Sequence, residues 1–289
     1  MKFWQPISWA ETEQLCEIAQ FAQECGFEGL MGADHALYPQ TMAPDYPYSD
    51  NGFPPQTAEH EYPDMWTSFG AMAAVTSKIK LVCGVYVLPI RNPIEVAKQA
   101  ATLAILSQGR FALGAGTGWM KEEFDAYDVP FKGRGKRMDE MLEIMRLLWT
   151  GEMVEYQGKH YQFGPMEMNP APSAPVPVWI GGISDPAMKR AARLADGWVT
   201  DLQTSEEIIG CIEQIREWRR EYGRAEQPFE VMATPSDAWD VDGYRRLEEA
   251  GVTHILTMPW PFYHGDSQAL EHKIDGIRRF ADDVIGHFD

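Results

Sequence analysis

Three stretches of this chain combine residue types that can do chemistry. Asp34-His35 puts a carboxyl group and an imidazole side by side. The run GAGTG at 114–118 lets the backbone approach a ligand closely, because glycine has no Cβ in the way. The segment GGIS at 181–184 stands before a helix that begins near Pro186, where backbone N–H groups can hold a phosphate. The glycine run alone is equally typical of a loop without a ligand, but turn geometry does not explain the Asp-His pair.

Strands and helices alternate along the chain and must position these stretches. Apolar, β-rich runs predict strands at 3–7, 27–33, 79–87, 111–113, 176–180, 198–200, 229–233 and 253–258. Helical periodicity and capping signals predict helices at 11–25, 64–76, 93–107, 134–149, 186–195, 206–222, 241–250 and 267–287. These eight units favour an α/β fold, a closed (β/α)8 TIM barrel that spans 1–289 as a single domain. An open doubly wound sheet is the alternative, although it more often stops at five or six strands.

Two segments depart from this alternation. The long segment 36–63 after the second strand is rich in Pro, Tyr and Asp, and a loop of that length is usually functional, as a lid or a substrate wall. Between the fourth helix and the fifth strand, VEYQGKHYQF at 154–163 predicts a small hairpin insertion. A proline-rich connector follows it.

The composition restricts the partners. The net charge of −18 disfavours nucleic acid and anionic lipid. No apolar run approaches the length of a membrane span and no signal-peptide pattern precedes the first strand, so we expect a cytoplasmic protein. The four cysteines lack CxxC spacing and are expected to be reduced, mostly buried thiols. No metal site is expected, because His60-Glu61 lacks the second histidine of HExxH.

Active sites of closed barrels lie at the C-terminal ends of the strands. The irregular features of this sequence fall there: Asp34-His35, Gly84-Val85, the glycine run, GGIS, Asp201 and Pro259-Trp260. This convergence predicts one shared site for a small-molecule substrate. A phosphate-binding aldolase or isomerase barrel is an alternative, but it would normally show a lysine or carboxylate base at a strand end, and no such lysine is evident.

Four blocks of the sequence resemble the luciferase-like monooxygenase superfamily, which contains flavin- and deazaflavin-dependent barrels. They are GADH (32–35) and the segments 87–131, 134–149 and 175–199, in the order and spacing of that superfamily. The resemblance is to the bacterial branch of coenzyme F420-dependent oxidoreductases. It implies an oxidoreductase that uses reduced FMN or F420 to oxygenate or reduce a small organic substrate. A catalytically silent flavin-binding barrel is the remaining alternative.

The resemblance also implies roles by position. Asp34 and His35 are the expected catalytic residues beside the cofactor ring, with His35 as proton donor or acceptor in hydride transfer. Gly84 and Val85 match a bulge of the third strand where relatives carry a non-prolyl cis peptide. The other expected cofactor contacts are Gly114, Thr117 and Gly118 along the ribityl chain and phosphate, and Gly181, Gly182, Ile183 and Ser184 at the phosphate.

Two positions differ from members of the superfamily. Bacterial luciferase and some FMN relatives have an arginine that pairs with the phosphate where this chain has Thr117. Sugar-phosphate dehydrogenases that use the deazaflavin have a glutamate where this chain has Trp119, which argues against that activity. The choice between FMN and F420 therefore stays open.

The two cofactors imply different partners. A monooxygenase that uses reduced FMN requires a covered pocket that excludes water, and it requires a flavin reductase as partner. Aromatic residues of the long loop are the expected cover: Tyr38, Tyr46, Tyr48, Phe53 and Tyr62. Relatives of this kind are often dimers, so a homodimer is a further expectation.

Overall fold

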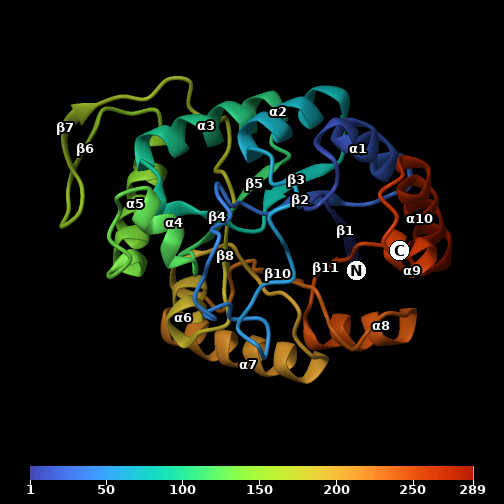
Figure 1. The fold of residues 1–289 in the computed structure, drawn as a ribbon. Coiled ribbons are helices and arrows are strands. Elements are labelled where there is room, and N and C mark those ends of the chain that lie inside the picture. Colours follow the sequence, from blue (N-terminus) through green and yellow to red (C-terminus); the bar gives the residue numbers. More distant parts are fainter. Residues whose placement is uncertain (289) are drawn as a thin grey trace.

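Eight parallel strands close into a barrel in the computed structural model, which describes residues 1–288 (Figure 1). The strand β1 lies between β2 and β11, and pairing of β3 with β5 completes the ring. This confirms the predicted (β/α)8 TIM barrel. The barrel strands are β1 (Lys2–Pro6), β2 (Gly29–Gly32), β3 (Lys80–Cys83), β5 (Phe111–Gly116), β8 (Val178–Gly181), β9 (Gly197–Val199), β10 (Glu230–Ala233) and β11 (His254–Leu256).

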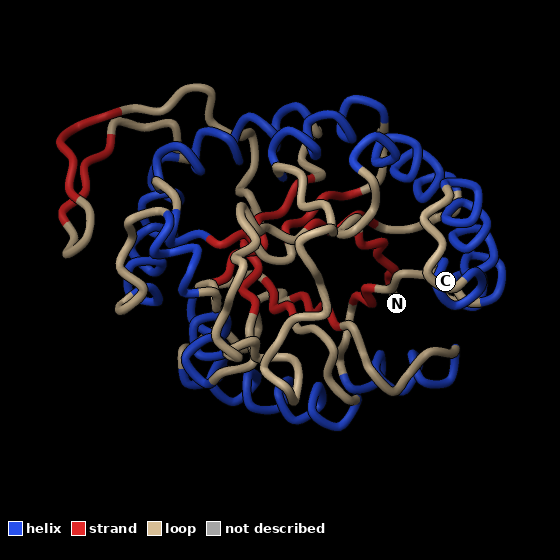
Figure 2. Tube along the Cα trace, viewed as in Figure 1, coloured by secondary structure: helices blue, strands red, loops and turns tan. Residues whose placement is uncertain are grey.

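Helices surround the barrel, as the blue ring around the red strands in Figure 2 shows. The long helices are α1 (Leu15–Glu24), α2 (Met65–Val75), α3 (Pro93–Leu106), α5 (Arg134–Leu148), α6 (Asp185–Leu194), α7 (Ser205–Glu221), α8 (Val241–Ala250) and α10 (Leu270–Asp283). Shorter ones are α4 (Lys121–Ala126), α9 (Trp260–His264) and the 3-10 turns η1 (Thr12–Gln14), η2 (Leu88–Ile90) and η3 (Ile285–His287). The helix predicted from 64 is confirmed as α2, and Asp64 caps it, since its carboxylate accepts from the N–H of Thr67 at 2.8 Å.

Two predicted strands were wrong in their bounds. The fourth strand does not end at Leu113 but continues as β5 through Gly116. Glycine allows this, because a Cβ at Gly114 would lie 1.7 Å from the carbonyl oxygen of Cys83 on the neighbouring strand. The third strand is interrupted, and β4 (Tyr86–Val87) follows a bulge after β3. The predicted last helix, 267–287, is present as α10 followed by η3, whereas the short helices α4 and α9 were not predicted.

The two insertions are present as predicted. The strands β6 (Val154–Gln157) and β7 (Gln162–Met166) form an antiparallel hairpin that projects away from the barrel (Figure 1). The loop 36–63 joins β2 to α2 and crosses in front of the barrel strands toward α7 (Figure 1).

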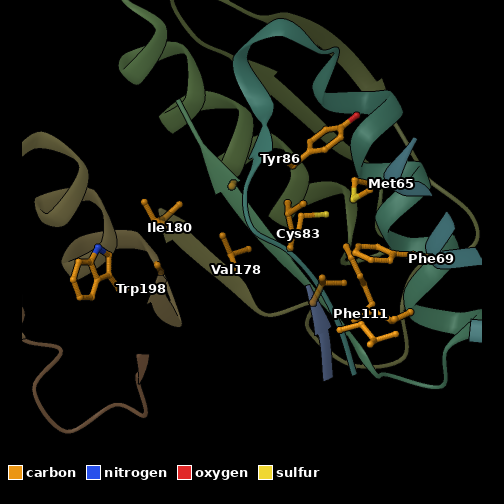
Figure 3. Packing of buried hydrophobic residues seen from close by; sticks show 14 of the residues in the cluster. Met65, Phe69, Cys83, Tyr86, Phe111, Val178, Ile180 and Trp198 are labelled. Carbon is orange, nitrogen blue, oxygen red and sulfur yellow. The ribbon is translucent and has the colours of Figure 1, made fainter. Parts of the chain in front are cut away.

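The core has two parts because the side chains of a strand alternate between the two faces of the barrel wall. The larger part lies between the strands and the helices, and Figure 3 shows its packing near Phe69 and Phe111. A smaller part fills the barrel: Trp4, Met31, Val82, Ala112, Trp179, Val199, Met232 and Leu256. All four cysteines are free, but only Cys83 is fully buried, which corrects the expectation of mostly buried thiols. Within residues 1–288, no helix has the length and apolar character needed to cross a membrane.

Candidate functional site

His35 stands at the C-terminal end of β2 and is fixed by a carboxylate that is distant in sequence. Its Nδ1 lies 3.0 Å from Oε2 of Glu123, whose other oxygen accepts from the N–H of Ala36 at 2.8 Å. Glu123 belongs to α4 and is only 2% exposed, whereas the His35 side chain keeps 15% of its surface exposed. A carboxylate only accepts hydrogen bonds, so it holds the imidazole with Nδ1 protonated and leaves Nε2 to exchange a proton.

Asp34 has a different set of partners from His35. Its carboxylate accepts from the N–H of Val87 at 2.9 Å and from Nη2 of Arg91 at 3.1 Å. Burial raises the pKa of Asp34, and the Arg91 guanidinium and the Val87 N–H oppose that rise. The predicted Asp34–His35 pair is therefore adjacent in sequence but its two side chains have separate tasks. Asp34 fixes the backbone that follows the bulge of the third strand.

That bulge contains a cis peptide bond between Gly84 and Val85, as the resemblance implied. Val85 points toward the glycines of two neighbouring strands. A Cβ at Gly116 would lie 2.3 Å from Cγ2 of Val85, and one at Gly181 would lie 2.6 Å from Cγ1. Close packing of protein against protein thus explains these glycines without a ligand. Gly84 and Val85 themselves remain partly exposed at the end of the barrel.

The predicted phosphate contacts lie on two neighbouring loops. Thr117 and Gly118 follow β5 and are partly exposed, and Arg134 of α5 donates from Nε to the carbonyl of Gly118 at 3.0 Å. The second segment, 181–184, begins at the last residue of β8 and leads into α6. In it, the N–H of Gly182 donates to Val199 at 3.3 Å, while Ser184 caps α6 without a side-chain hydrogen bond.

Aromatic side chains from the long loop and from the segment after β5 surround His35. Its ring centroid lies 5.3 Å from that of Tyr62 and 5.9 Å from that of Trp119. Trp119 in turn lies 5.2 Å from Tyr46. The indole N–H of Trp9 donates to the Tyr62 hydroxyl at 2.9 Å and ties the loop to the segment after β1. Five aromatic residues were predicted as cover. Tyr46 and Tyr62 belong to this cluster, and Tyr48 packs edge-on against Tyr46. Phe53 and Tyr38 are exposed.

The structure places most of the predicted site residues at the ends of the barrel strands and adds one residue that was not predicted. Gly114 differs from the prediction, because it is buried within β5 against Cys83. Glu123 was missed, although the sequence carried a signal for it. Met120, Glu123 and Phe124 follow helical spacing, and all three are buried, so a carboxylate lies on the apolar side of α4. A buried carboxylate needs a hydrogen-bond partner, and His35 is that partner.

Comparison with known proteins adds to this geometry. The sequence model of the family described as luciferase-like monooxygenase matches residues 5–283. The chain belongs to the luciferase-like monooxygenase family. An uncharacterized protein of Mycobacterium tuberculosis is 36% identical to this chain over 270 residues, which cover 93% of each of the two chains. An F420-dependent glucose-6-phosphate dehydrogenase of Nakamurella multipartita is 28% identical over 281 residues, 94% of this chain and 75% of the other.

A solved structure supports the same fold. The coenzyme F420 dependent tetrahydromethanopterin reductase from Methanopyrus kandleri has a TM-score of 0.77 at 18% identity, over 100% of this chain and 99% of the other. The family and these two named enzymes are oxidoreductases, and both named enzymes depend on coenzyme F420.

Proposed function

We propose that this protein is an oxidoreductase that binds coenzyme F420 at the C-terminal end of the barrel and exchanges a hydride between it and a small organic substrate. The observation that supports this best is the histidine at the end of β2, held by a buried glutamate and partly exposed beside the bulge at Gly84-Val85. A proton donor or acceptor of fixed orientation is what hydride transfer to or from a C–O or C–N bond needs.

The residues on the rim fit a phosphorylated, planar cofactor. In the part of the chain that the structure describes, the N–H groups of Ile183, Ser184 and Asp185 at the start of α6 have no protein acceptor. Such N–H groups and the positive end of the helix dipole suit a phosphate. Gly84, Val85, Thr117 and Gly118 are partly exposed on the same rim and would line the ring and the ribityl chain. When bound, F420 supplies or accepts the hydride.

The protein's own part in the reaction is proton transfer and exclusion of water. Glu123 fixes the ring of His35, so Nε2 is the atom that takes the proton from a substrate hydroxyl or returns it. Tyr62 and Trp119 pack around that imidazole and limit the access of water. Asp34 acts at a distance, because it holds Val87 and Arg91 behind the bulge.

Reduced FMN is the second candidate cofactor, and the aromatic cover contributed by the loop 36–63 favours it. A monooxygenase needs such a cover to keep water from its reactive intermediate. Thr117 favours F420 instead, because it offers no cation where some FMN relatives pair an arginine with the phosphate. We therefore rank F420 first.

A binding titration separates these candidates. Purified protein is titrated with F420, FMN and reduced FMN, and binding is followed by absorbance and fluorescence. Tight binding of F420 with weak binding of both FMN forms supports the proposal. Preference for reduced FMN would make the protein a two-component monooxygenase, and binding of none of the three would refute a flavin-type function altogether.

A further inference from the structure

A cavity of about 200 Å³ lies between α7 and the barrel wall, at the opposite end of the barrel from His35. The segment that leads into β10 forms one side of it, and Gly251, at the end of α8, lies shortly before β11. These positions place the cavity at the N-terminal ends of the two strands. The lining residues are Ile212, Ile215, Arg216, Arg219, Ala225, Gln227, Phe229, Val231 and Gly251.

One face of α7 supplies much of this wall. Its four lining residues follow i, i+3, i+4, i+7 spacing, so their side chains share that face: Ile212, Ile215, Arg216 and Arg219. Both isoleucines are buried, and Val231 of β10 adds a third buried apolar side chain. The wall is therefore largely apolar. Its charged groups are two guanidiniums, and no carboxylate lines the cavity.

Arg216 is an exposed residue whose side chain has no partner in the protein. Among residues 1–288, its guanidinium forms no ion pair and donates no hydrogen bond, unlike the neighbouring Arg219 and Arg224. The turn at Gly251 gives this guanidinium its space, because a Cβ there would lie 2.1 Å from Nη2 of Arg216. Gly251 has a φ of +109°, a conformation that favours glycine.

Arg219, by contrast, is only 3% exposed. Its Nη2 donates to the carbonyls of Arg224 at 2.8 Å and Gln227 at 2.7 Å, and its Cζ lies 4.2 Å from the centroid of the Phe229 ring. Within residues 1–288, its Nη1 is buried without a hydrogen-bond partner, and no carboxylate forms an ion pair with it. A buried charge without a counter-charge is unfavourable, so Arg219 would stabilise an anion held in the cavity.

We propose that this cavity binds the carboxylate of a small, largely apolar organic acid. Arg216 is the direct partner of the carboxylate, because a guanidinium presents two parallel N–H donors that match its two oxygens. Arg219 is the buried positive charge beside it. The apolar wall suits a ring or a short chain, which a bare phosphate would leave unused. The cavity is smaller than the roughly 300–1,000 Å³ of sites for drug-sized ligands, so the acid is small.

The test uses three small molecules. The whole protein is titrated calorimetrically with benzoate, with benzyl alcohol, which has the ring without the charge, and with acetate, which has the charge without the ring. We expect benzoate to bind at least about tenfold more tightly than either of the others. Arg216→Gln should weaken benzoate binding by at least about tenfold, because it removes the partner of the carboxylate.

The matched control is Arg220→Gln, which makes the same charge change at an exposed residue of α7 that does not line the cavity. It should leave benzoate binding unchanged. Melting temperatures without ligand establish that both variants are folded. Benzoate that binds at the rim beside His35 would have the same affinity for Arg216→Gln as for the wild-type protein, since Arg216 lies at the other end of the barrel.

Four results would overturn the site: no binding of millimolar benzoate to the wild-type protein, benzyl alcohol binding as tightly as benzoate, acetate binding as tightly as benzoate, or full benzoate binding by folded Arg216→Gln. The site does not rest on the oxidoreductase function proposed above. A parallel titration with F420 keeps the two proposals apart, because loss of F420 binding would refute that function while leaving the benzoate result intact.

Discussion

Each end of the barrel holds a histidine beside a carboxylate, but the two pairs differ in how many hydrogen bonds they complete. At the N-terminal end, His254 begins β11 and is 2% exposed. Its Nδ1 accepts from the indole N–H of Trp4 at 2.9 Å, and its Nε2 lies 3.0 Å from Oε2 of Glu230. Both ring nitrogens are used, since indole only donates and carboxylate only accepts.

At the C-terminal end, a carboxylate holds one ring nitrogen of His35, the other has no hydrogen-bond partner within residues 1–288, and the ring is partly exposed. The pairing with Glu123 orients the ring but leaves Nε2 available. The comparison teaches that the same two residue types stabilise a fold when every polar atom is satisfied, and suit chemistry when one atom is left free. Four predictions test whether the His254 pair serves stability and the His35 pair serves catalysis.

The largest effect is expected for His35→Ala. We expect kcat with F420 and a turned-over substrate to fall about 100- to 10,000-fold, because the proton-transfer group is lost. The melting temperature should change little, because the imidazole is partly exposed and not packed in the core. Steady-state kinetics and thermal unfolding measure the two quantities, with the exposed His160→Ala as control. Equal losses of activity and stability would contradict a role in proton transfer.

The second prediction concerns the opposite end. His254→Ala should lower the free energy of unfolding by about 3 kcal/mol, because it leaves a cavity and an unpaired indole N–H at Trp4. Activity per folded molecule should stay near that of the wild-type protein, since the substitution lies at the far end of the barrel. Chemical denaturation gives the first value. A large fall in kcat without loss of stability would contradict the assignment of stabilisation to the N-terminal end and of catalysis to the C-terminal end.

Glu123→Gln should have a smaller effect on the reaction than removal of His35 itself. The amide keeps the size of the side chain but can donate as well as accept, so His35 loses its fixed tautomer. We expect kcat to fall about 10- to 100-fold with F420 affinity unchanged. Glu95→Gln, an exposed residue of α3, is the matched control. Unchanged kcat in the Glu123 variant would mean that its carboxylate only supports the fold.

The smallest effect concerns pH. Burial lowers the pKa of His254 below 6.5, although Glu230 opposes this, so the folded state binds its proton less readily than the unfolded state. The stability that neutral His254 contributes is fully present above the pKa of this group in the unfolded state. It is lost as pH falls from that pKa toward the lower pKa in the folded state. Between pH 7.5 and 5.5, the wild-type melting temperature should therefore fall more than that of His254→Ala. An equal fall in both proteins would contradict this assignment.

The carboxylate partner titrates in a separate range. The hydrogen bond from His254, followed by smaller effects from Thr253 and Lys2, lowers the pKa of Glu230 from 4.5 to about 2. The stability that ionised Glu230 contributes is present above pH 4.5 and is lost as pH falls from 4.5 toward about 2. The window from pH 7.5 to 5.5 thus reports on the imidazole and not on its partner.

Local patterns in the sequence determined most of the fold. The cap at Asp64, the proline that opens α3 and the alternation of eight apolar runs with helical ones each involve residues a few positions apart, and the structure confirms them. The glycine run was harder to interpret. Glycine marks both the end of a strand and a close contact between strands, and at Gly114 the contact with Cys83 was the cause.

Tertiary structure alone decided which side chains meet at the rim. His35 could be placed at the end of a strand from the sequence, but its partner Glu123 is 88 residues away and Asp34 turns to Arg91 instead. Periodicity reports which face of an element is buried, because burial is a local average. Which buried carboxylate meets which base depends on closure of the barrel, since that step brings eight distant strand ends to one rim.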